Sequence, residues 1–445
     1  MFHKILVANR GEIAVRIIRA CRTMGIQTVA IHSMADAESL HVQLADESLC
    51  IGPASPLESY LNPFSVLSAA QLSGAEAIHP GYGFLSENAR FARMCAKCGV
   101  TFIGPSAECI ERMGDKLQAR RTMIEAGVRV IPGSEGVLEG PEHALRVAEE
   151  VGYPVMIKAA AGGGGRGIRR VESPEELTPA YESAQAEAQA AFGDGRLYME
   201  RCIENAYHIE VQILADGQGR AVHLCERNCS MQRRNQKVLE EAPCSHISPE
   251  LRREMGEMAV RAALAAGYSN AGTVEFLLDK AGNYYFMEMN TRIQVEHPVT
   301  EMITGVDLIE QQICIAAGEP FTLTQDAIHP SGHAIECRIN AEDPAHGYRP
   351  CCGTIQSLHV PGGPGVRFDS MLYQGTVISP HYDSMLGKLI VHAPTREHAI
   401  RRMNMALMEL VVEGVTTNMD FMLELINEPG FLAGDYDVSY IANRG

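Results

Sequence analysis

The sequence predicts a multidomain protein of α/β and α+β architecture, and three observations lead to this fold class. The length of 445 residues corresponds to about three domains of roughly 150 residues each. Near the N-terminus, apolar runs alternate with helical patterns, which predicts a doubly wound parallel sheet. After Pro330 the pattern becomes mostly β and is followed by a helix. We expect three domains, at residues 1–114, 115–328 and 329–445.

The N-terminal domain begins with a β-α-β pattern. Ile13, Ile17 and Cys21 repeat at helical spacing between the first two of four apolar runs, and the turn before them lacks the G-x-G-x-x-G spacing of dinucleotide sites. Tyr82 follows the third run, where open α/β sheets bind ligands, and is either a substrate-facing residue or an ordinary loop aromatic. The strand-like runs are residues 5–8, 28–32, 75–79 and 100–103.

The central domain contains a predicted β-hairpin with acidic residues. Its two runs and four-residue turn are residues 273–279, 284–290 and 280–283. If Asp279 faces Tyr284, then Glu275 faces Glu288, and two opposed carboxylates repel one another. A divalent cation would reverse that repulsion, and Asn290 adds a neutral oxygen on the same face, which suits Mg²⁺ or Mn²⁺ held with nucleotide phosphates. The alternative is an acidic, solvated strand face.

Polar residues continue beyond this hairpin. Arg292, Gln294 and Glu296 alternate, so we expect them to leave the strand on one side before residues 297–298, His-Pro, end it. Arg292 could bind a small planar anion through its fork of donors, and Glu296 could act as a general base on that anion.

Three further segments indicate a nucleotide site. A glycine-rich loop at residues 162–167 joins two strand-like runs, and Lys158 precedes it, unlike the lysine of a P-loop. The loop could cover phosphates with backbone N–H groups, or be a flexible surface hairpin. Residues 198–203 suit an adenine pocket. The basic cluster at residues 231–237 meets phosphates or forms a solvated face.

The C-terminal third alternates as a strand at residues 333–340 and has an amphipathic helix at 396–412 whose apolar spacing is typical of a core. Arg338 lies in the middle of that strand, among apolar neighbours. Such an arginine is either paired structurally or directed at a ligand, and the sequence leaves both open.

Whole-chain properties exclude some classes of protein. The net charge of −17 argues against nucleic acid or an anionic membrane as the main partner. The apolar run at residues 5–8 is too short for a signal peptide, and no apolar run of membrane-spanning length follows it. The thirteen cysteines show no repeating spacing, and the lone pair Cys95-x-x-Cys98 gives little support for zinc or redox chemistry. We therefore expect reduced, packed thiols and a cytoplasmic location.

Several motifs together resemble a known family. Residues 153–160 with the following glycines, and residues 286–293, resemble the paired signatures of ATP-grasp ligases, which carbamoyl-phosphate synthetases share. The remaining motifs, at residues 8–14, 79–88, 294–301 and 382–385, narrow the resemblance to the biotin carboxylases. Because there is no Met-Lys-Met biotinylation motif and the chain ends with the family's third domain, it resembles the separate bacterial subunit of acetyl-CoA carboxylase.

The resemblance implies an activity and partners. It implies ATP-dependent carboxylation of biotin by bicarbonate through carboxyphosphate, the first half-reaction of acetyl-CoA carboxylase in fatty acid synthesis. It implies ATP, about two Mg²⁺ or Mn²⁺ ions, and biotin as a substrate bound to a carrier. The implied partners are a biotin carboxyl carrier protein, the carboxyltransferase subunits and a second copy of the chain as a homodimer. The central domain would carry a mobile lid subdomain at about residues 131–203.

The resemblance also implies site residues. Those for ATP are Lys116, Lys158, Gly163, Gly164, Gly165, Glu200, Arg201, Ile203, His208, Gln232, Asn235, Lys237, Glu275 and Glu288. Those for metal are Glu275, Glu288 and Asn290. Those for bicarbonate are Lys237, Arg292, Gln294, Val295 and Glu296, and those for biotin are Tyr82, Arg338 and Asp383. The implied catalytic set is Glu296 as the base, Arg338 as the stabiliser of the biotin enolate, Lys237 and Arg292.

Two departures and two alternatives accompany this resemblance. Asn235 stands where the family commonly has His, and Ala206-Tyr207 replaces the usual Pro-Arg. An ATP-grasp ligase with another acceptor is disfavoured by the contexts of Tyr82 and Arg338. A catalytically inactive nucleotide-binding regulator would be expected to lack catalytic residues that this chain retains, such as Glu296.

Overall fold

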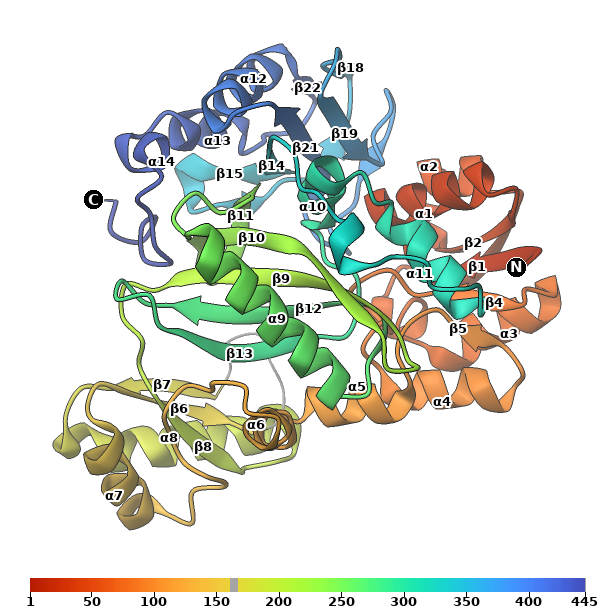
Figure 1. The fold of residues 1–445 in the computed structure, drawn as a ribbon. Helices are drawn as coiled ribbons and strands as arrows, with labels where there is room; N and C mark the ends of the chain where they lie inside the picture. Colours follow the sequence, from red (N-terminus) through yellow and green to blue (C-terminus); the bar gives the residue numbers. More distant parts are fainter. Residues whose placement is uncertain (161–166, 445) are drawn as a thin grey trace.

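The computed structural model describes residues 1–160 and 167–444, arranged as a parallel N-terminal sheet, a large antiparallel sheet, a small lid and a C-terminal layer of helices (Figure 1). The expected phosphate-loop residues Gly163, Gly164 and Gly165 lie outside the described residues. None of the described helices is both long and apolar enough to cross a membrane.

The N-terminal sheet, drawn in red and orange in Figure 1, has five parallel strands in the order β3-β2-β1-β4-β5. Ile5 and Val7 of β1 pack in one core and Leu6 in another, because successive side chains point to opposite faces. The predicted doubly wound sheet is therefore confirmed. Its strands are β1 (Lys4–Val7), β2 (Gln27–Ser33), β3 (Glu47–Gly52), β4 (Ala77–His79) and β5 (Thr101–Phe102). Its helices are α1 (Gly11–Thr23), α2 (Leu40–Leu44), α3 (Pro63–Ser73), α4 (Ala89–Lys97) and α5 (Ala107–Gly114).

Helix α6 (Lys116–Glu125), which Asp115 caps at its N-terminus, leads from this domain to the lid. The lid is a three-stranded antiparallel sheet in the order β7-β6-β8, with two helices and its own apolar core. Lys158 pairs with Ile168, so the two strand-like runs that flank the glycine-rich loop are neighbouring antiparallel strands. The lid elements are α7 (Pro141–Val151), β6 (Val155–Ala159), β7 (Ile168–Val171), α8 (Pro174–Phe192) and β8 (Leu197–Arg201).

The large sheet has eight antiparallel strands in the order β13-β12-β9-β10-β11-β14-β21-β19. It crosses the expected boundary at residues 328–329, because Leu239 of β11 pairs with Cys337 of β14. The central and C-terminal segments therefore share one sheet, which holds the site residues at fixed register. Its strands are β9 (Tyr207–Asp216), β10 (Ala221–Arg233), β11 (Gln236–Ala242), β12 (Ser269–Leu278), β13 (Tyr284–Asn290), β14 (His333–Asn340), β19 (Val366–Ser370) and β21 (Met385–Ala393). The helices beside it are α9 (Pro249–Ala265), α10 (His297–Thr304) and α11 (Leu308–Ala316).

The predicted β12–β13 hairpin is present, with a different register at its loop. Leu278, and not Asp279, pairs with Tyr284, because Asp279 closes the loop by accepting backbone N–H groups from Ala281 and Asn283. A β-bulge between Glu275 and Phe276 restores the register, so that Glu275 still faces Glu288.

The C-terminal layer, blue in Figure 1, covers one end of the large sheet with helices and short strand pairs. The expected helix at 396–412 ends at Glu409, because Leu410 is extended and Val411–Glu413 pairs with another strand. Two consecutive β-branched residues favour that strand. The remaining elements are β15 (Glu342–Asp343), β16 (Arg349–Pro350), β17 (Gly353–Thr354), β18 (Ser357–His359), β20 (Val377–Ile378), α12 (Arg396–Glu409), β22 (Val411–Glu413), α13 (Met419–Ile426) and α14 (Pro429–Ala433). Single 3₁₀ turns are η1 (Met34–Asp36), η2 (Pro56–Glu58), η3 (Gln325–Ala327) and η4 (Pro344–His346).

All thirteen cysteines lie within the described residues and all are free thiols, as expected. Cys95 is buried on α4 and Cys98 is exposed just beyond it. Burial raises the pKa of the Cys95 thiol to about 12, which makes it unreactive at neutral pH.

Candidate active site

The site is built on one face of the large sheet, around a row of polar side chains on β9. His208, Glu210 and Gln212 point to this face, while the residues between them pack in the core under α9. Alternation along a strand explains this division. All three polar residues are buried, so each requires a partner.

Lys237 provides the central cation. Its ammonium nitrogen lies 2.5 Å from Glu210, 3.0 Å from Glu275 and 2.6 Å from Glu296, measured to the nearest carboxylate oxygen. Burial lowers the pKa of Lys237, but these three carboxylates outweigh it and raise the pKa well above its ordinary value. The sequence placed Lys237 in a basic cluster, and the structure surrounds it with acids from three separate segments.

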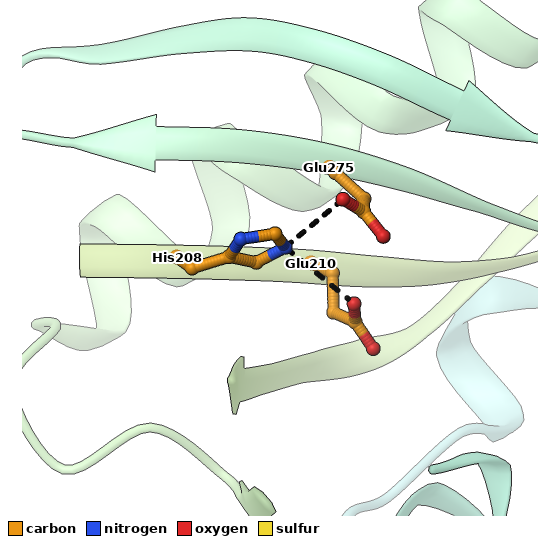
Figure 2. Close-up of side chains that lie close together, drawn as sticks. All are labelled: His208, Glu210 and Glu275. Atoms are coloured by element: carbon orange, nitrogen blue, oxygen red, sulfur yellow. Dashed lines mark ion pairs between the residues drawn. The ribbon is translucent and has the colours of Figure 1, made fainter. Parts of the chain in front are cut away.

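Glu275 is the most heavily bonded acid of the group. One of its oxygens accepts from Lys237, Asn290 and Gln294, and the other lies 3.0 Å from the Nε2 atom of His208. Figure 2 shows His208 between Glu275 and Glu210, whose oxygen is 3.8 Å from the same nitrogen. Burial raises the pKa of Glu275, but Lys237 and His208 outweigh it, so the net shift is strongly downward.

The predicted metal ligands Glu275, Glu288 and Asn290 lie close together, but their hydrogen bonding differs. Glu288 faces Glu275 and forms no side-chain hydrogen bond within the described residues; burial, and then the charge of Glu275, raise its pKa. The amide oxygen of Asn290 accepts from Arg292, 3.1 Å away, and its amide nitrogen donates to Glu275. His208, Glu210 and Glu275 form another candidate cluster, whose ligand atoms all lie within 4.8 Å of one another. Two facing carboxylates and an amide remain an oxygen donor set that suits Mg²⁺ or Mn²⁺.

Arg227, which sequence reasoning missed, organises the floor of the site. Its side chain is fully buried on β10 and donates to Glu210 at 2.5 Å and to Gln294 at 2.8 Å. It also donates to Gln212, Thr273 and Thr300. Arg227 lies in the run Glu226-Arg227-Asn228 in the middle of β10, and its partners come from four other segments of the chain.

Glu296 and Arg338 form a further ion pair of the site. One oxygen of Glu296 accepts from Lys237 and the other from Arg338, at 2.9 Å, and Arg338 also bonds to Glu240 at 2.5 Å. Burial raises the pKa of Glu296, but Lys237 and Arg338 outweigh it and hold the pKa well below its ordinary value. Burial raises the pKa of Glu240 to about 7, against the lowering effect of Arg338. Arg338 is therefore structurally paired and also faces the site.

The expectation that a strand continues to residues 297–298 is wrong. Strand β13 ends at Asn290, and His297 begins α10, with Pro298 in its first turn. Proline is favoured there because the first N–H groups of a helix have no partner within it. The turn that replaces the strand directs Glu296 to Lys237 and Gln294 to Glu275. Arg292 instead donates to Glu87, at 2.9 Å, in the N-terminal domain.

The residues expected to bind ATP lie on the lid and on the sheet. Lys158 and Glu200 form a 2.5 Å ion pair on the lid, and Arg120 bonds to the other oxygen of Glu200. On the sheet, Gln232 lies 3.0 Å from the ring Nδ1 of His208. Lys116 begins α6, and its charge lowers the pKa of Glu288, against the larger effects of burial and Glu275.

Three remaining members of that ATP set lie at the edge of a strand or in a turn. Arg201 is the last residue of β8, and Ile203 lies two residues beyond it. Both line a cavity of about 340 Å³ between the lid and the loop at Asp279. Arg234 and Asn235 form the two-residue turn between β10 and β11, with φ of 50° and 63°. A two-residue turn with positive φ at both positions favours Asn, because Asn adopts the left-handed conformation more readily than most residues. The backbone conformation therefore explains why Asn is tolerated at position 235.

The departure at Ala206-Tyr207 leaves the entry into β9 intact. The carbonyl of Ala206 accepts from the N–H of Val438, at 3.0 Å, and Ala206 is wholly buried. Tyr207 stacks on His246 with a ring separation of 4.9 Å.

The expected biotin residues lie at the junction of the N-terminal domain and the sheet. The hydroxyl of Tyr82 donates to buried Glu12 on α1, and the positive charge of Arg338 is close enough to lower the pKa of Tyr82, against burial and Glu12. Asp383 accepts from the N–H of Met385, and the adjacent Tyr382 packs against Arg10, 4.0 Å from its ring centre. The hydroxyl of Tyr82 is thus held by α1 at this junction.

Comparisons with known proteins agree with this architecture. Residues 1–110 match the family described as the biotin carboxylase N-terminal domain, 115–324 the carbamoyl-phosphate synthase L chain ATP binding domain, and 336–443 the biotin carboxylase C-terminal domain. Biotin carboxylase of Nostoc sp. is 56% identical over 440 residues, which cover 99% of this chain and 98% of that protein. Biotin carboxylase 1 of Bacillus subtilis is 53% identical over 442 residues, 99% of this chain and 98% of that protein.

Solved structures of biotin carboxylases have the same fold as this chain. The biotin carboxylase of Campylobacter jejuni, in a βγ-ATP complex, is 49% identical with a TM-score of 0.97, covering 100% of this chain and 99% of that chain. The biotin carboxylase domain dimer of Hydrogenobacter thermophilus 2-oxoglutarate carboxylase is 52% identical with a TM-score of 0.95, covering 99% of this chain and 97% of that chain. That structure contains MgADP, ADP and bicarbonate. The chain belongs to the biotin carboxylase family.

Proposed function

We propose that this protein catalyses the ATP-dependent carboxylation of biotin by bicarbonate. The observation that carries the proposal is the position of Glu296, whose two carboxylate oxygens are held separately by Lys237 and Arg338. This arrangement joins a base, a cation for phosphate and a cation for a second anion in one cluster. Full-length similarity to biotin carboxylases supports the same reaction.

In the first step, an oxygen of bicarbonate attacks the γ-phosphorus of ATP, the bond to ADP breaks, and carboxyphosphate forms. Arg292, Gln294 and the N–H of Val295 would orient bicarbonate, and Glu296 would take its proton. Lys237, Lys158, Lys116, His208 and Gln232 would neutralise and place the phosphates, with Asn235 at the edge of the site. Such a transfer depends chiefly on positioning and on charge stabilisation.

The low pKa of Glu296 fits a base that is activated by its substrates. Without ligands, Lys237 and Arg338 both neutralise it. When ATP phosphates attract Lys237 and biotin attracts Arg338, Glu296 loses part of each counter-charge, and its pKa rises. The base would then become strong only in the complete complex, which protects ATP from wasteful hydrolysis.

Glu275, Glu288 and Asn290 would hold the metal, which supplies charge neutralisation at the phosphates. The three residues fit this role because Glu288 has no competing hydrogen bond among the described residues and repels Glu275. Glu200, Arg201 and Ile203 would bind adenine at the end of β8. The glycines Gly163, Gly164 and Gly165 would close over the phosphates as part of a mobile lid at about residues 131–203.

In the second step, carboxyphosphate divides into CO₂ and phosphate, and the phosphate takes the ureido proton of biotin. The resulting enolate attacks CO₂ and forms carboxybiotin. Arg338 would stabilise the enolate, with Tyr82 and Asp383 beside the ring system. Glu240 keeps Arg338 in place through a 2.5 Å contact.

For partners, we propose a biotin carboxyl carrier protein, carboxyltransferase subunits of acetyl-CoA carboxylase and a homodimer, in the cytoplasm and in fatty acid synthesis. Thirteen free thiols suit a reducing compartment. Biotin carboxylase parts of 2-oxoglutarate and pyruvate carboxylases are each 52% identical to this chain, so the acceptor requires its own test. We expect the chain to support carboxylation of acetyl-CoA when mixed with the carrier and carboxyltransferase; support for pyruvate or 2-oxoglutarate carboxylation alone would reassign the complex.

The reaction is tested by measuring ADP release with Mg²⁺ and ATP, with and without bicarbonate and free biotin. We expect release to require bicarbonate and to increase with biotin. Release that ignores biotin would indicate a ligase with another acceptor, and nucleotide binding without turnover would indicate a regulator.

A further inference from the structure

Lys388 is a wholly buried cation that no sequence motif singled out. It lies on β21, and its side chain has no exposed surface. It pairs across the sheet with Arg338 on β14, and two opposed cations on one sheet face repel one another. A buried charge with a like-charged neighbour is costly, so its contacts must compensate for this cost.

The first contact of Lys388 reaches the segment proposed to hold bicarbonate. Its ammonium nitrogen donates to the carbonyl oxygen of Val295, at 2.7 Å. That carbonyl belongs to the peptide group joining Val295 to Glu296. One buried donor therefore fixes the peptide between the residue proposed to bind bicarbonate and the residue proposed to deprotonate it.

The second contact of Lys388 reaches the side proposed for biotin. Its ammonium lies 3.2 Å from Glu12 on α1, and the same oxygen of Glu12 accepts the hydroxyl of Tyr82. Glu12 is buried, and its other oxygen has no hydrogen-bond partner among the described residues. The two contacts form one continuous chain from Tyr82 through Glu12 and Lys388 to Val295.

We propose that Lys388 is a positioning residue that sets the bicarbonate segment and links it, through Glu12, to the biotin-side Tyr82. This inference rests on the proposed function. Lys388 acts through the Val295–Glu296 peptide and touches no substrate itself. Loss of its ammonium would allow this peptide to move, and a displacement of about 1 Å at a reacting group costs about a hundredfold in rate.

The test uses Lys388→Met, which keeps most of the aliphatic side chain and removes the donor. We expect the KM for bicarbonate to rise about tenfold or more, while the KM for ATP changes by less than about twofold. A general loss of stability would not separate these two constants. Arg396→Met is the matched control, because Arg396 also donates to a buried carboxylate, Glu241 at 2.7 Å, but contacts none of the site residues.

Glu12→Gln keeps the proposal falsifiable if Lys388→Met does not fold. It preserves shape and leaves the contact of Lys388 with Val295. We expect biotin-stimulated ADP release to fall by about tenfold, with bicarbonate-dependent release in the absence of biotin kept within about twofold. The link from Lys388 through Glu12 to Tyr82 would be overturned if biotin-stimulated ADP release were the same in the variant and the parent. It would also be overturned if the variant lost biotin-stimulated and biotin-independent release to the same extent.

The outcomes separate this inference from the proposed function. If the parent protein shows no bicarbonate-dependent ADP release, the proposed function fails. If the parent is active and folded Lys388→Met keeps its KM for bicarbonate within about twofold, or raises both KM values together, the role of Lys388 is refuted.

Discussion

Replacing Glu296 with Gln tests the base and its two cations together. The change keeps the shape of the side chain, which is nearly buried, and removes its charge. One oxygen remains to accept from one cation, and the new amide N–H₂ group faces the other cation without an acceptor. The variant therefore loses one charge-assisted hydrogen bond while both cations stay in place.

The cost to stability follows from what each cation retains. Lys237 keeps Glu210 at 2.5 Å and Glu275 at 3.0 Å, and Arg338 keeps Glu240 at 2.5 Å. Neither cation is left unpaired, so we expect a loss of about 2 to 3 kcal/mol, the value of one hydrogen bond to a charged group. This loss lowers Tm by a few degrees in a protein of this size and leaves it folded.

The cost to activity is expected to be larger. Loss of a general base reduces rates by about 10² to 10⁴-fold. We expect kcat for bicarbonate-dependent ADP release to fall in this range, while the dissociation constant of MgATP, measured by calorimetry, changes little. A kcat within about tenfold of the parent would remove Glu296 as the base. Glu241→Gln is the control, since it makes the same change at a buried carboxylate that bonds instead to His333 and Arg396.

Further predictions concern four other residues. Arg338→Ala should spare MgATP binding and abolish carboxylation of biotin, measured by radiolabelled bicarbonate fixed in carboxybiotin. Glu288→Gln should raise the Mg²⁺ concentration for half-maximal activity and, in metal-free buffer, raise Tm, because it removes repulsion with Glu275. Burial raises the pKa of Glu241, but its bonds to His333 and Arg396 outweigh burial and lower the pKa from 4.5 to about 2. The resulting stability of about 3 kcal/mol is present above pH 4.5 and is lost as the pH falls toward 2. Urea titrations should therefore show that the difference in the free energy of unfolding between the parent and Glu241→Gln shrinks as the pH falls from 4.5 toward 2. Asn235→Gly should keep or raise Tm, because glycine adopts the positive φ of this turn without strain.

Distinct results would contradict each of these predictions. Unchanged fixation of label in the Arg338 variant would refute its role in carboxyl transfer. An unaltered Mg²⁺ requirement in the Glu288 variant would move the metal site elsewhere. A stability gap independent of pH would show that the Glu241 charge is not the source of its contribution. A lower Tm after Asn235→Gly would mean that the Asn side chain itself stabilises the turn.

Local patterns were sufficient to predict much of the fold. The apolar runs and helical spacing near the N-terminus predicted a parallel sheet, because each strand carries its own signal. The pairing of Glu275 with Glu288 was predicted correctly, although the loop was counted one residue short. The bulge beside Phe276 that compensates for this has no local sequence signal.

Long-range pairing was not predictable in the same way. The periodicity of β14 indicates a strand but does not identify its neighbour, so the junction of β11 and β14 across the expected domain boundary was not foreseen. Arg227, Glu240 and Lys388 were missed for a related reason. Each is a polar residue inside a strand, and its role depends on partners that are distant in the sequence.

The measurement that tests the central claim most directly follows the oxygen atoms of bicarbonate. Bicarbonate carrying a heavy oxygen isotope is supplied with ATP, Mg²⁺ and biotin, and the released phosphate is analysed by mass spectrometry. Attack of bicarbonate on the γ-phosphorus predicts one labelled oxygen in each phosphate molecule. Phosphate whose new oxygen comes only from water would contradict the carboxyphosphate route and, with it, the role proposed for Glu296.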